Sequence, residues 1–252
     1  MWNGKMKAVT FSYDDAVTSD ERLIDIFNRY GIRATFNINS GTLVHQGQPR
    51  VTWRAKRGYG YLTKFYIEEI AEVYKEHEVA SHGYLHRGLD KLSRKECENE
   101  LLPDLDTLEK AVGYRPVGMA YANGYYSDTA VGVIRSLGLG YARATNPTYS
   151  FDLQSDLLRF RPTLRHRDER LMELAREFIA LKPEKPQLFS VWGHSEEFEH
   201  DGNWELIERL CELLASDSGI FFGTNSEVLL GKRVGTFHKT PAYPGEAFSK
   251  TE

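Results

Sequence analysis

Cysteine is scarce in this chain of 252 residues, which has only Cys97 and Cys211. Both lie in helix-like stretches between apolar neighbours, so we expect two buried thiols rather than a disulfide, as in a reducing compartment. The chain also has no apolar run long enough to span a bilayer, and residues 1–5 do not open a signal peptide. These absences predict a cytoplasmic protein without membrane contact.

An excess of charge of one sign is absent as well. The 32 basic and 36 acidic residues give a formal net charge of −4, and no basic block stands out. Proteins that bind nucleic acid or anionic membranes use such blocks, so we expect neither partner. No Gly-x-Gly-x-x-Gly follows the first expected strand, which removes the support for a dinucleotide site.

Short apolar segments alternate with segments of helical periodicity along the chain. Residues 7–13 and 32–38 read as strands with a helix between them, which is a βαβ unit with parallel strands. The alternation continues with further strands expected at 79–81, 116–122, 141–144, 157–164, 188–192 and 220–222. Helices are expected at 63–74, 93–112, 127–137, 168–181 and 204–214. The pattern predicts an α/β fold, a distorted or incomplete (β/α) barrel with about seven parallel strands.

One stretch interrupts this alternation. Residues 40–62 contain four glycines and a proline and predict a long loop, with Lys56, Arg57 and Tyr59 among its side chains. Such a loop is either a surface insertion or a lid that contacts substrate, because aromatic faces stack on sugar rings. We assign residues 1–231 to a single catalytic domain. Residues 232–252 are expected to form a tail that packs on the domain or extends from it.

Polar side chains follow several of the expected strands at their carboxyl ends. Asp14 and Asp15 follow the first strand, and His82 and His86 follow the third. Asn123 follows a middle strand, and His194 a late one. In a barrel these strand ends meet on one face, so we expect the six side chains to converge there.

The residue types suggest a metal-dependent hydrolase. If the backbone makes one helical turn from His82 to His86, both imidazoles can bind one divalent metal ion. An aspartate of the Asp14-Asp15 pair is the best third ligand, and this donor set suits zinc, with cobalt, manganese or nickel as alternatives. The other aspartate points away along the strand and is free to act as general base on metal-bound water. His194 then serves as general acid, and backbone N–H groups at Asn123-Gly124 hold the oxyanion.

Four motifs resemble those of the polysaccharide deacetylase (NodB-homology) family of carbohydrate esterases, over about residues 6–230. Ser-Tyr-Asp-Asp-Ala at 12–16 is similar to the family's Thr-Phe-Asp-Asp-Gly, and His-Gly-Tyr-Leu-His at 82–86 to its His-Ser/Thr-x-x-His. The third and last motifs are represented by residues 120–124 and 188–194. The resemblance implies a distorted barrel and metal-dependent deacetylation of sugars. It also implies that Asp14 is the base, Asp15 a metal ligand and the N–H of Asn123 part of the oxyanion hole.

The sequence departs from the family pattern at several positions. Ala16 replaces a glycine, and Ala120 replaces the arginine that braces the base in many members. Ser195 stands where an aspartate often follows the last histidine, and the family's Asp-Trp motif has no counterpart. From motif order alone, Arg161 is a candidate for the missing cation.

Three functions stay open at this stage. The first is a divalent-metal-dependent hydrolase that removes N- or O-linked acetyl groups from a carbohydrate. The second acts on small cyclic amides or ureides with the same fold, and the third is a catalytically impaired relative that still binds carbohydrate. The absence of a leader peptide favours small or intracellular substrates. The oligomeric state is not predicted.

Overall fold

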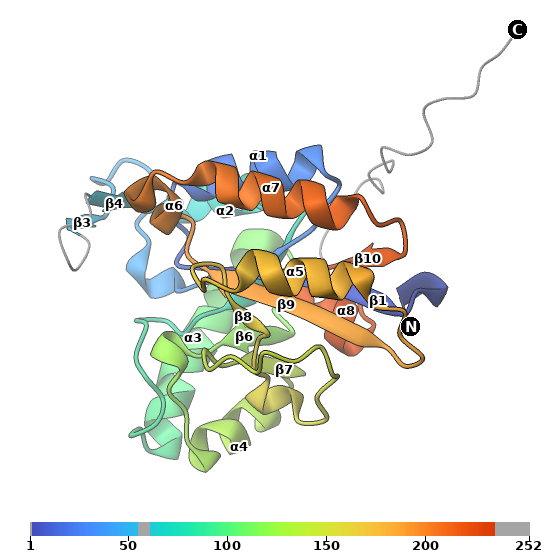
Figure 1. Cartoon of the computed structure of the whole chain (residues 1–252). Helices are drawn as coiled ribbons and strands as arrows, with labels where there is room; N and C mark the ends of the chain where they lie inside the picture. Colours follow the sequence, from blue (N-terminus) through green and yellow to red (C-terminus); the bar gives the residue numbers. More distant parts are fainter. Residues whose placement is uncertain (1, 55–60, 235–252) are drawn as a thin grey trace, which may run out of the picture.

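A curled sheet of parallel strands forms the centre of the molecule (Figure 1). The computed structural model describes residues 2–54 and 61–234. Neighbouring strands follow the order β7-β6-β5-β2-β1-β9-β8, β10 also pairs with β1, and every one of these pairings is parallel. The strands are β1 (Lys7–Asp14), β2 (Thr35–Ile38), β5 (Glu78–Ser81), β6 (Gly118–Ala120), β7 (Tyr141–Arg143), β8 (Leu164–Arg165), β9 (Gln187–Gly193) and β10 (Ile220–Phe222). The expected distorted barrel of about seven parallel strands is confirmed.

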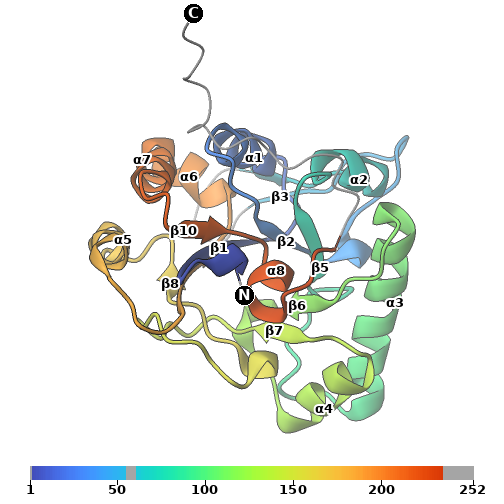
Figure 2. The same cartoon turned by 90° about the vertical axis from the view of Figure 1, so that its right-hand side faces the viewer.

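Helices surround this sheet, as Figure 2 shows in a view along the strands. They are α1 (Asp20–Arg29), α2 (Ile70–Val73), α3 (Arg94–Val112), α4 (Asp128–Ser136), α5 (Leu171–Ala180), α6 (Glu196–Asp201), α7 (Trp204–Ala215) and α8 (Asn225–Leu230). The short helix α8 lies near the centre of that view, where Asn225 accepts a hydrogen bond from Thr10 and donates its N–H to Thr35. It therefore covers the end of the barrel opposite the carboxyl ends of the strands.

Local sequence signals account for the best-defined helices. Ser93 and Glu96 form a capping box at the start of α3, and Gly113 ends this helix with a positive φ of 79°. The apolar side of α1 is buried in the largest core cluster, which lies between the sheet and helices α1, α5 and α7. A second cluster fills the space between β6, β7 and helices α3 and α4. The free thiols of Cys97 and Cys211 are buried in different clusters, as expected.

The backbone of one residue, Phe160, connects β7 to the segment that carries β8 and so nearly closes the barrel. The N–H of Phe160 donates to Ala142 on β7, and the carbonyl of Phe160 accepts from Ala144. Four residues later, from Leu164, the same segment pairs with β9 as strand β8. The strand expected over 157–164 is therefore only partly right. Phe160 and Leu164 pair with neighbouring strands, whereas residues 157–159 form a 3₁₀ turn and Pro162 has no N–H for a ladder.

The segment over 40–62 is not one long loop. It contains an antiparallel hairpin, β3 (Thr52–Arg54) and β4 (Tyr61–Thr63), which lies at the far left of Figure 1. The helix expected from Thr63 is wrong at its start: Thr63 ends β4, and helical structure begins only with a 3₁₀ turn at Ile67–Glu69. Lys56, Arg57 and Tyr59 of the expected lid lie outside the described residues.

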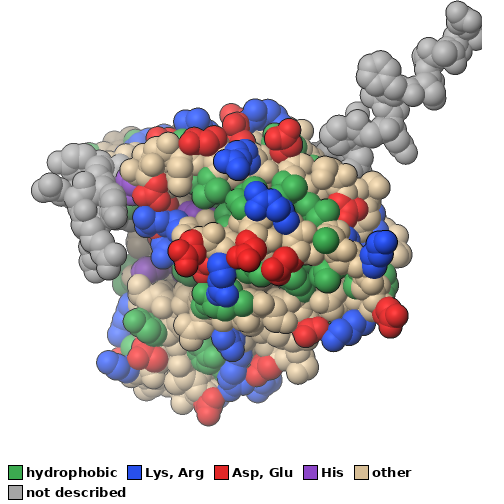
Figure 3. Space-filling model, in the orientation of Figure 1, with side chains coloured by type: hydrophobic (Ala, Val, Ile, Leu, Met, Phe, Trp, Pro, Cys, Tyr) green, Lys and Arg blue, Asp and Glu red, His purple; other side chains and the backbone are tan. Residues whose placement is uncertain are grey.

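The limits of the domain stay a prediction. From residue 235 onward the expected tail lies outside the described residues. Among the residues that the structure describes, no helix is long and apolar enough to cross a membrane. The surface in Figure 3 carries acidic and basic side chains interspersed over this face, and histidine side chains are visible at its left, towards the hairpin.

Candidate active site

The two aspartates at the end of β1 point to different partners. Asp14 is the last residue of the strand and is buried. Asp15 and Ala16 both have a positive φ, 86° and 53°, so the chain turns sharply directly after the strand. As a result Asp14 faces Asn37 and Arg143, whereas Asp15 accepts a hydrogen bond of 2.7 Å from Nδ2 of Asn39. The expected divergence of the two side chains is present.

His82 follows β5 with a fixed ring orientation. Its Nδ1 lies 2.9 Å from the carbonyl oxygen of Ala120. A carbonyl oxygen can only accept a hydrogen bond, so Nδ1 carries the proton. The lone pair of Nε2 therefore faces the site, 3.8 Å from Oδ2 of Asp14. A backbone carbonyl that orients a histidine in this way is typical of metal ligands.

His86 reaches the same place without a helical turn, so that expectation is wrong. Residues 82–86 form a loop with positive φ at Gly83 and His86, and Glu100 of α3 accepts the N–H groups of Leu85 and Arg87. A side chain at Gly83 would lie 3.0 Å from the Glu100 carboxylate, and the positive φ adds strain. The imidazole rings of His82 and His86 still come together, with centroids 4.7 Å apart.

Asp15, His82 and His86 fit a divalent metal ion. One ligand atom from each lies within 4.8 Å of the other two, and Nε2 of His86 is 3.9 Å from Oδ1 of Asp15. Two imidazoles and one carboxylate are a common donor set for catalytic zinc, and three protein ligands leave coordination positions open. The donor atoms and their spacing therefore suit the divalent metal ion that the sequence suggested.

A buried arginine braces Asp14. Nη2 of Arg143 on β7 lies 2.6 Å from Oδ2 of Asp14, and Nδ2 of Asn37 donates to Oδ1 at 2.8 Å. Burial raises the pKa of Asp14, but the charges of Arg143, His82 and His194 outweigh burial and leave the pKa below its usual value. Asp14 is thus a carboxylate at neutral pH, able to accept a proton.

The arginine expected from motif order is a different one, and that expectation is wrong. The guanidinium of Arg161 is exposed and donates to the backbone oxygens of Asn146 and Pro147, with Nη2 2.7 Å from the latter. Arg143 lies in a strand that the sequence predicted, between apolar neighbours. A charged side chain within an apolar strand is the signal that could have identified Arg143, because such charges are rarely buried without a partner.

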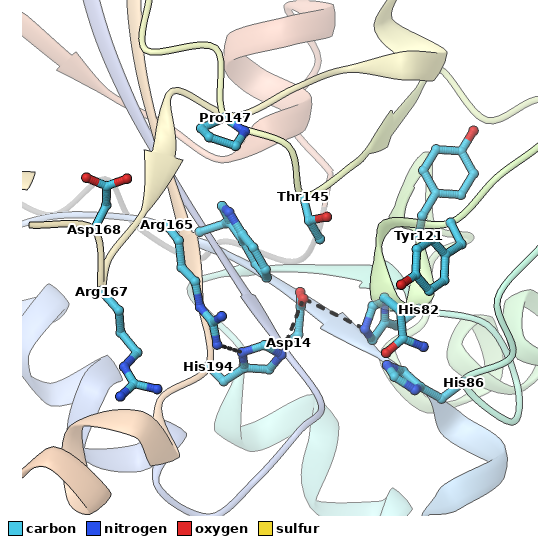
Figure 4. A pocket seen from close by; sticks show the side chains of 13 residues that line it. Asp14, His82, His86, Tyr121, Thr145, Pro147, Arg165, Arg167, Asp168 and His194 are labelled. Carbon is cyan, nitrogen blue, oxygen red and sulfur yellow. Dashed lines mark hydrogen bonds and ion pairs between the residues drawn. The ribbon is translucent and has the colours of Figure 1, made fainter. Parts of the chain in front are cut away.

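Three carboxylates and the guanidinium of Arg165 surround His194. Its Nε2 is 4.0 Å from Asp14 and 3.9 Å from Asp15, while Nδ1 is 3.7 Å from Oε2 of Glu197. Figure 4 shows its ring between Asp14 and Arg165. Burial lowers the pKa of His194, but Glu197 and the other nearby carboxylates outweigh it and raise the pKa to about 9. The imidazole is therefore protonated at neutral pH, as a general acid needs to be.

Glu197, on the first turn of α6, is a site residue that the sequence reasoning missed. Its carboxylate is ion-paired with Arg165 and Arg167, lies 3.2 Å from Nε2 of His166, and faces His194. These partners hold the pKa of Glu197 far below its usual value, although burial alone would raise it. Glu197 thus provides the fixed negative charge beside His194 for which no Asp-Trp motif was found. Its position three residues after His194 was the only signal in the sequence.

An open cleft of about 1010 Å³ lies over these residues. Asp14, His82, His86, Asn123 and His194 all line it, together with the aromatic side chains of Tyr121, Tyr125 and Trp192 (Figure 4). Asn123 has a positive φ of 56°, and the next N–H, that of Gly124, already donates to Tyr121. Of the two N–H groups expected to hold an oxyanion, only that of Asn123 makes no hydrogen bond within the described residues.

Comparison with known proteins adds a family match. Residues 3–142 match the family model described as polysaccharide deacetylase. No curated protein sequence is similar enough to count as a match.

Solved structures share the fold at low sequence identity. A protein from Mycobacterium smegmatis, provisionally named a polysaccharide deacetylase, is 17% identical, with 90% of each chain covered and a TM-score of 0.63. A family 4 acetyl xylan esterase from Clostridium thermocellum, solved with a cobalt ion, is 15% identical, with 89% of this chain and 91% of that chain covered and a TM-score of 0.57. A family 4 pseudoenzyme from Bacillus anthracis is 17% identical, with 90% and 67% covered and a TM-score of 0.53. The fold thus occurs both in enzymes and in a protein that has lost activity.

Proposed function

This chain belongs to the polysaccharide deacetylase family, and we propose that it removes N- or O-linked acetyl groups from a carbohydrate with the help of a divalent metal ion. Membership follows from the family match over residues 3–142, more than half of the chain. It confirms the expected family and the expected enzyme class, a hydrolase of amide or ester bonds. The metal, the roles of individual residues and the substrate belong to the proposal.

One observation carries the proposal. Asp15, His82 and His86 place three ligand atoms within 4.8 Å of one another, and Asp14 and His194 lie beside them. These residues come from the ends of β1, β5 and β9, which are far apart in the sequence. Side chains of a solvated surface have no reason to gather in this way, whereas hydrolysis needs a base, an acid and an electrophile around one carbonyl.

Each residue has a distinct part in the reaction. Asp15, His82 and His86 would hold the divalent ion, which would supply a Lewis acid to polarise a carbonyl and lower the pKa of water. Asp14, kept ionised by Arg143, takes the proton of the water that attacks the acetyl carbonyl. The N–H of Asn123 donates to the carbonyl oxygen as negative charge develops on it.

His194 completes the reaction on the other side of the carbonyl. Protonated at neutral pH, it gives its proton to the leaving amine or alcohol of the sugar. Oε2 of Glu197 lies 3.7 Å from Nδ1 and holds the ring so that Nε2 faces the reacting group. The carboxylate of Glu197 acts here as a positioning residue, since it touches His194 and does not line the cleft.

Arg143 and Glu197 also help to judge the third alternative, a catalytically impaired relative that still binds carbohydrate. That alternative arose because the bracing arginine and the Asp-Trp motif are missing from their usual places in the sequence. A buried arginine on β7 and a glutamate on α6 now stand beside the base and the acid. Their presence supports turnover over a role in binding alone.

The test is acetate release from acetylated chito-oligosaccharides, measured beside a panel of small cyclic amides and ureides. We expect acetate from the glycans, no product from the small amides, and no activity in His82→Ala. His45→Ala is the matched control, because that histidine is 74% exposed and lies outside the cleft. Product from the small amides alone would point to the second alternative. Full activity in a metal-free His82→Ala protein would reject the mechanism.

A further inference from the structure

Lys64 is a buried lysine next to the candidate metal site. Lys64 directly follows β4 and is only 1% exposed. Backbone hydrogen bonds from Thr18 to Thr63 and from Phe65 to Ala16 attach this segment to the residues that follow Asp15. Lysine is rarely buried to this extent without a partner that balances its charge.

An asparagine connects Lys64 to the metal ligand Asp15. Nζ of Lys64 donates to Oδ1 of Asn39, and the same oxygen accepts a hydrogen bond of 2.8 Å from Thr42. Because Oδ1 serves two donors, the amide can point only one way, and Nδ2 donates to Oδ1 of Asp15 at 2.7 Å. The result is a chain of cation, amide and carboxylate that ends on the oxygen nearest to His86.

Other acidic groups also act on Lys64, namely Asp20, Asp104 and Glu196. Two of these three carboxylates have hydrogen-bond partners of their own. Asp20 is hydrogen-bonded by Ser195 and Tyr74, and Asp104 by Ser40 and Ser81. Among the carboxylates around Lys64, Asp15 is thus the one whose oxygen also faces the histidine ligands.

We propose that Lys64 is an internal counter-ion of Asp15 that limits the affinity of the site for a divalent cation and stabilises the carboxylate while no cation is bound. This inference rests on the proposed function, because it assumes that Asp15, His82 and His86 hold a metal ion. A cation in that site and the ammonium group of Lys64 share one carboxylate and repel each other at low dielectric. The ammonium group is not screened by bulk water, since Lys64 is almost fully buried.

The decisive variant is Lys64→Gln, which keeps a donor for Asn39 and removes only the charge. We expect the metal-free variant to melt at a lower temperature than the wild type. We also expect zinc to bind at least tenfold more tightly in a competition with a chromogenic chelator. Lys75→Gln is the matched control, because Lys75 is exposed, pairs with Glu72, and undergoes the same change of charge. Its zinc affinity should equal that of the wild type.

Lys64→Met is the second variant, with similar length and no hydrogen-bonding group. It should also bind zinc more tightly if charge is the cause. Unchanged or weaker zinc affinity in either folded variant overturns the inference and leaves the proposed function intact. Absence of zinc binding by the wild type contradicts the proposed function itself, and with it the assumption on which Lys64 was interpreted.

Discussion

The carboxylate of Asp14 and the guanidinium of Arg143 form a buried ion pair, with Nη2 2.6 Å from Oδ2, although 129 positions separate the two residues. Removing Arg143 leaves the negative charge of Asp14 without its strongest partner, so the pKa of Asp14 rises. A base works only above its pKa. In Arg143→Met we therefore expect the acidic limb of the kcat/KM profile to move to higher pH, and activity at neutral pH to fall by roughly 100-fold.

Arg161→Met is the matched control for that experiment. The guanidinium of Arg161 is exposed and, within the described residues, donates to the backbone oxygens of Asn146 and Pro147, so its removal should leave the pH profile unchanged. Because a buried pair is strongly destabilised when one partner is lost, each variant is first checked by thermal denaturation. An Arg143→Met protein that is folded and has the wild-type acidic limb would contradict the assigned role.

Glu197 controls the other limb of the same profile. The pKa of His194 lies near 9 because Glu197 and the neighbouring acids outweigh burial. A general acid works only below its pKa, so the alkaline limb should move to lower pH in Glu197→Gln. The loss of ring orientation should also reduce kcat by roughly 10²-fold. Glu199→Gln, on the exposed side of the same helix, should change neither value, and equal behaviour of the two variants would disprove the role of Glu197.

Tyr125 bears on how the substrate lies in the cleft. This side chain lines the cleft and is 58% exposed, which is unusual for a large aromatic ring. Its backbone is fixed by hydrogen bonds to Ala122 and Leu89, so the ring presents a firm apolar face. We expect Tyr125→Ala to raise KM for acetylated chito-oligosaccharides about tenfold and to leave hydrolysis of a small acetate ester unchanged. Leu102→Ala, at another exposed apolar side chain on α3, should affect neither substrate.

His77 should make the stability of the fold depend on pH, independently of the active site. Burial, with a smaller contribution from Arg33, lowers its pKa to about 3. Histidine in the unfolded chain titrates near 6.5, so the unfolded state binds more protons between these two values. The contribution of His77 is thus complete above about pH 6.5, and it is lost as the pH falls towards 3, by roughly 5 kcal/mol in all.

Chemical denaturation at a series of pH values measures this effect. His77→Asn keeps an acceptor for the N–H of Ala34, which Nδ1 of His77 now accepts, but it does not titrate. The variant should lose stability less steeply than the wild type between pH 6.5 and 4, whatever its stability at pH 7. Parallel curves for the two proteins over that range would show that His77 does not contribute.

The parts of the site that follow strand ends could be predicted from the sequence. Asp14, Asp15, His82 and His194 lie at the end of an apolar strand or directly after it, and the geometry of parallel strands brings such positions together. His86 lies four residues beyond His82 in the loop that follows the same strand. The fold class followed from the same alternation. Local periodicity was sufficient in these cases because the strands are short, buried and bounded by polar residues.

The parts that depend on contacts distant in the sequence could not be predicted. Arg143 braces Asp14 from across the barrel, and motif order pointed to Arg161 instead. The histidine loop follows no helical turn, because its shape is set by Glu100 on α3. The role of Lys64 depends on backbone hydrogen bonds between the end of the hairpin and the residues after Asp15. No local sequence pattern predicts these contacts. These features are determined by tertiary packing, which local propensity and motif spacing do not describe.

The central claim is that Asp15, His82 and His86 share one metal ion. Titration of the metal-free protein with cobalt, followed by its visible absorption, tests this claim most directly. We predict one cobalt ion bound per wild-type chain, and loss of that binding in Asp15→Ala, His82→Ala and His86→Ala, with His45→Ala unchanged. A wild-type protein that binds no cobalt, or three variants that bind it as the wild type does, would contradict the account.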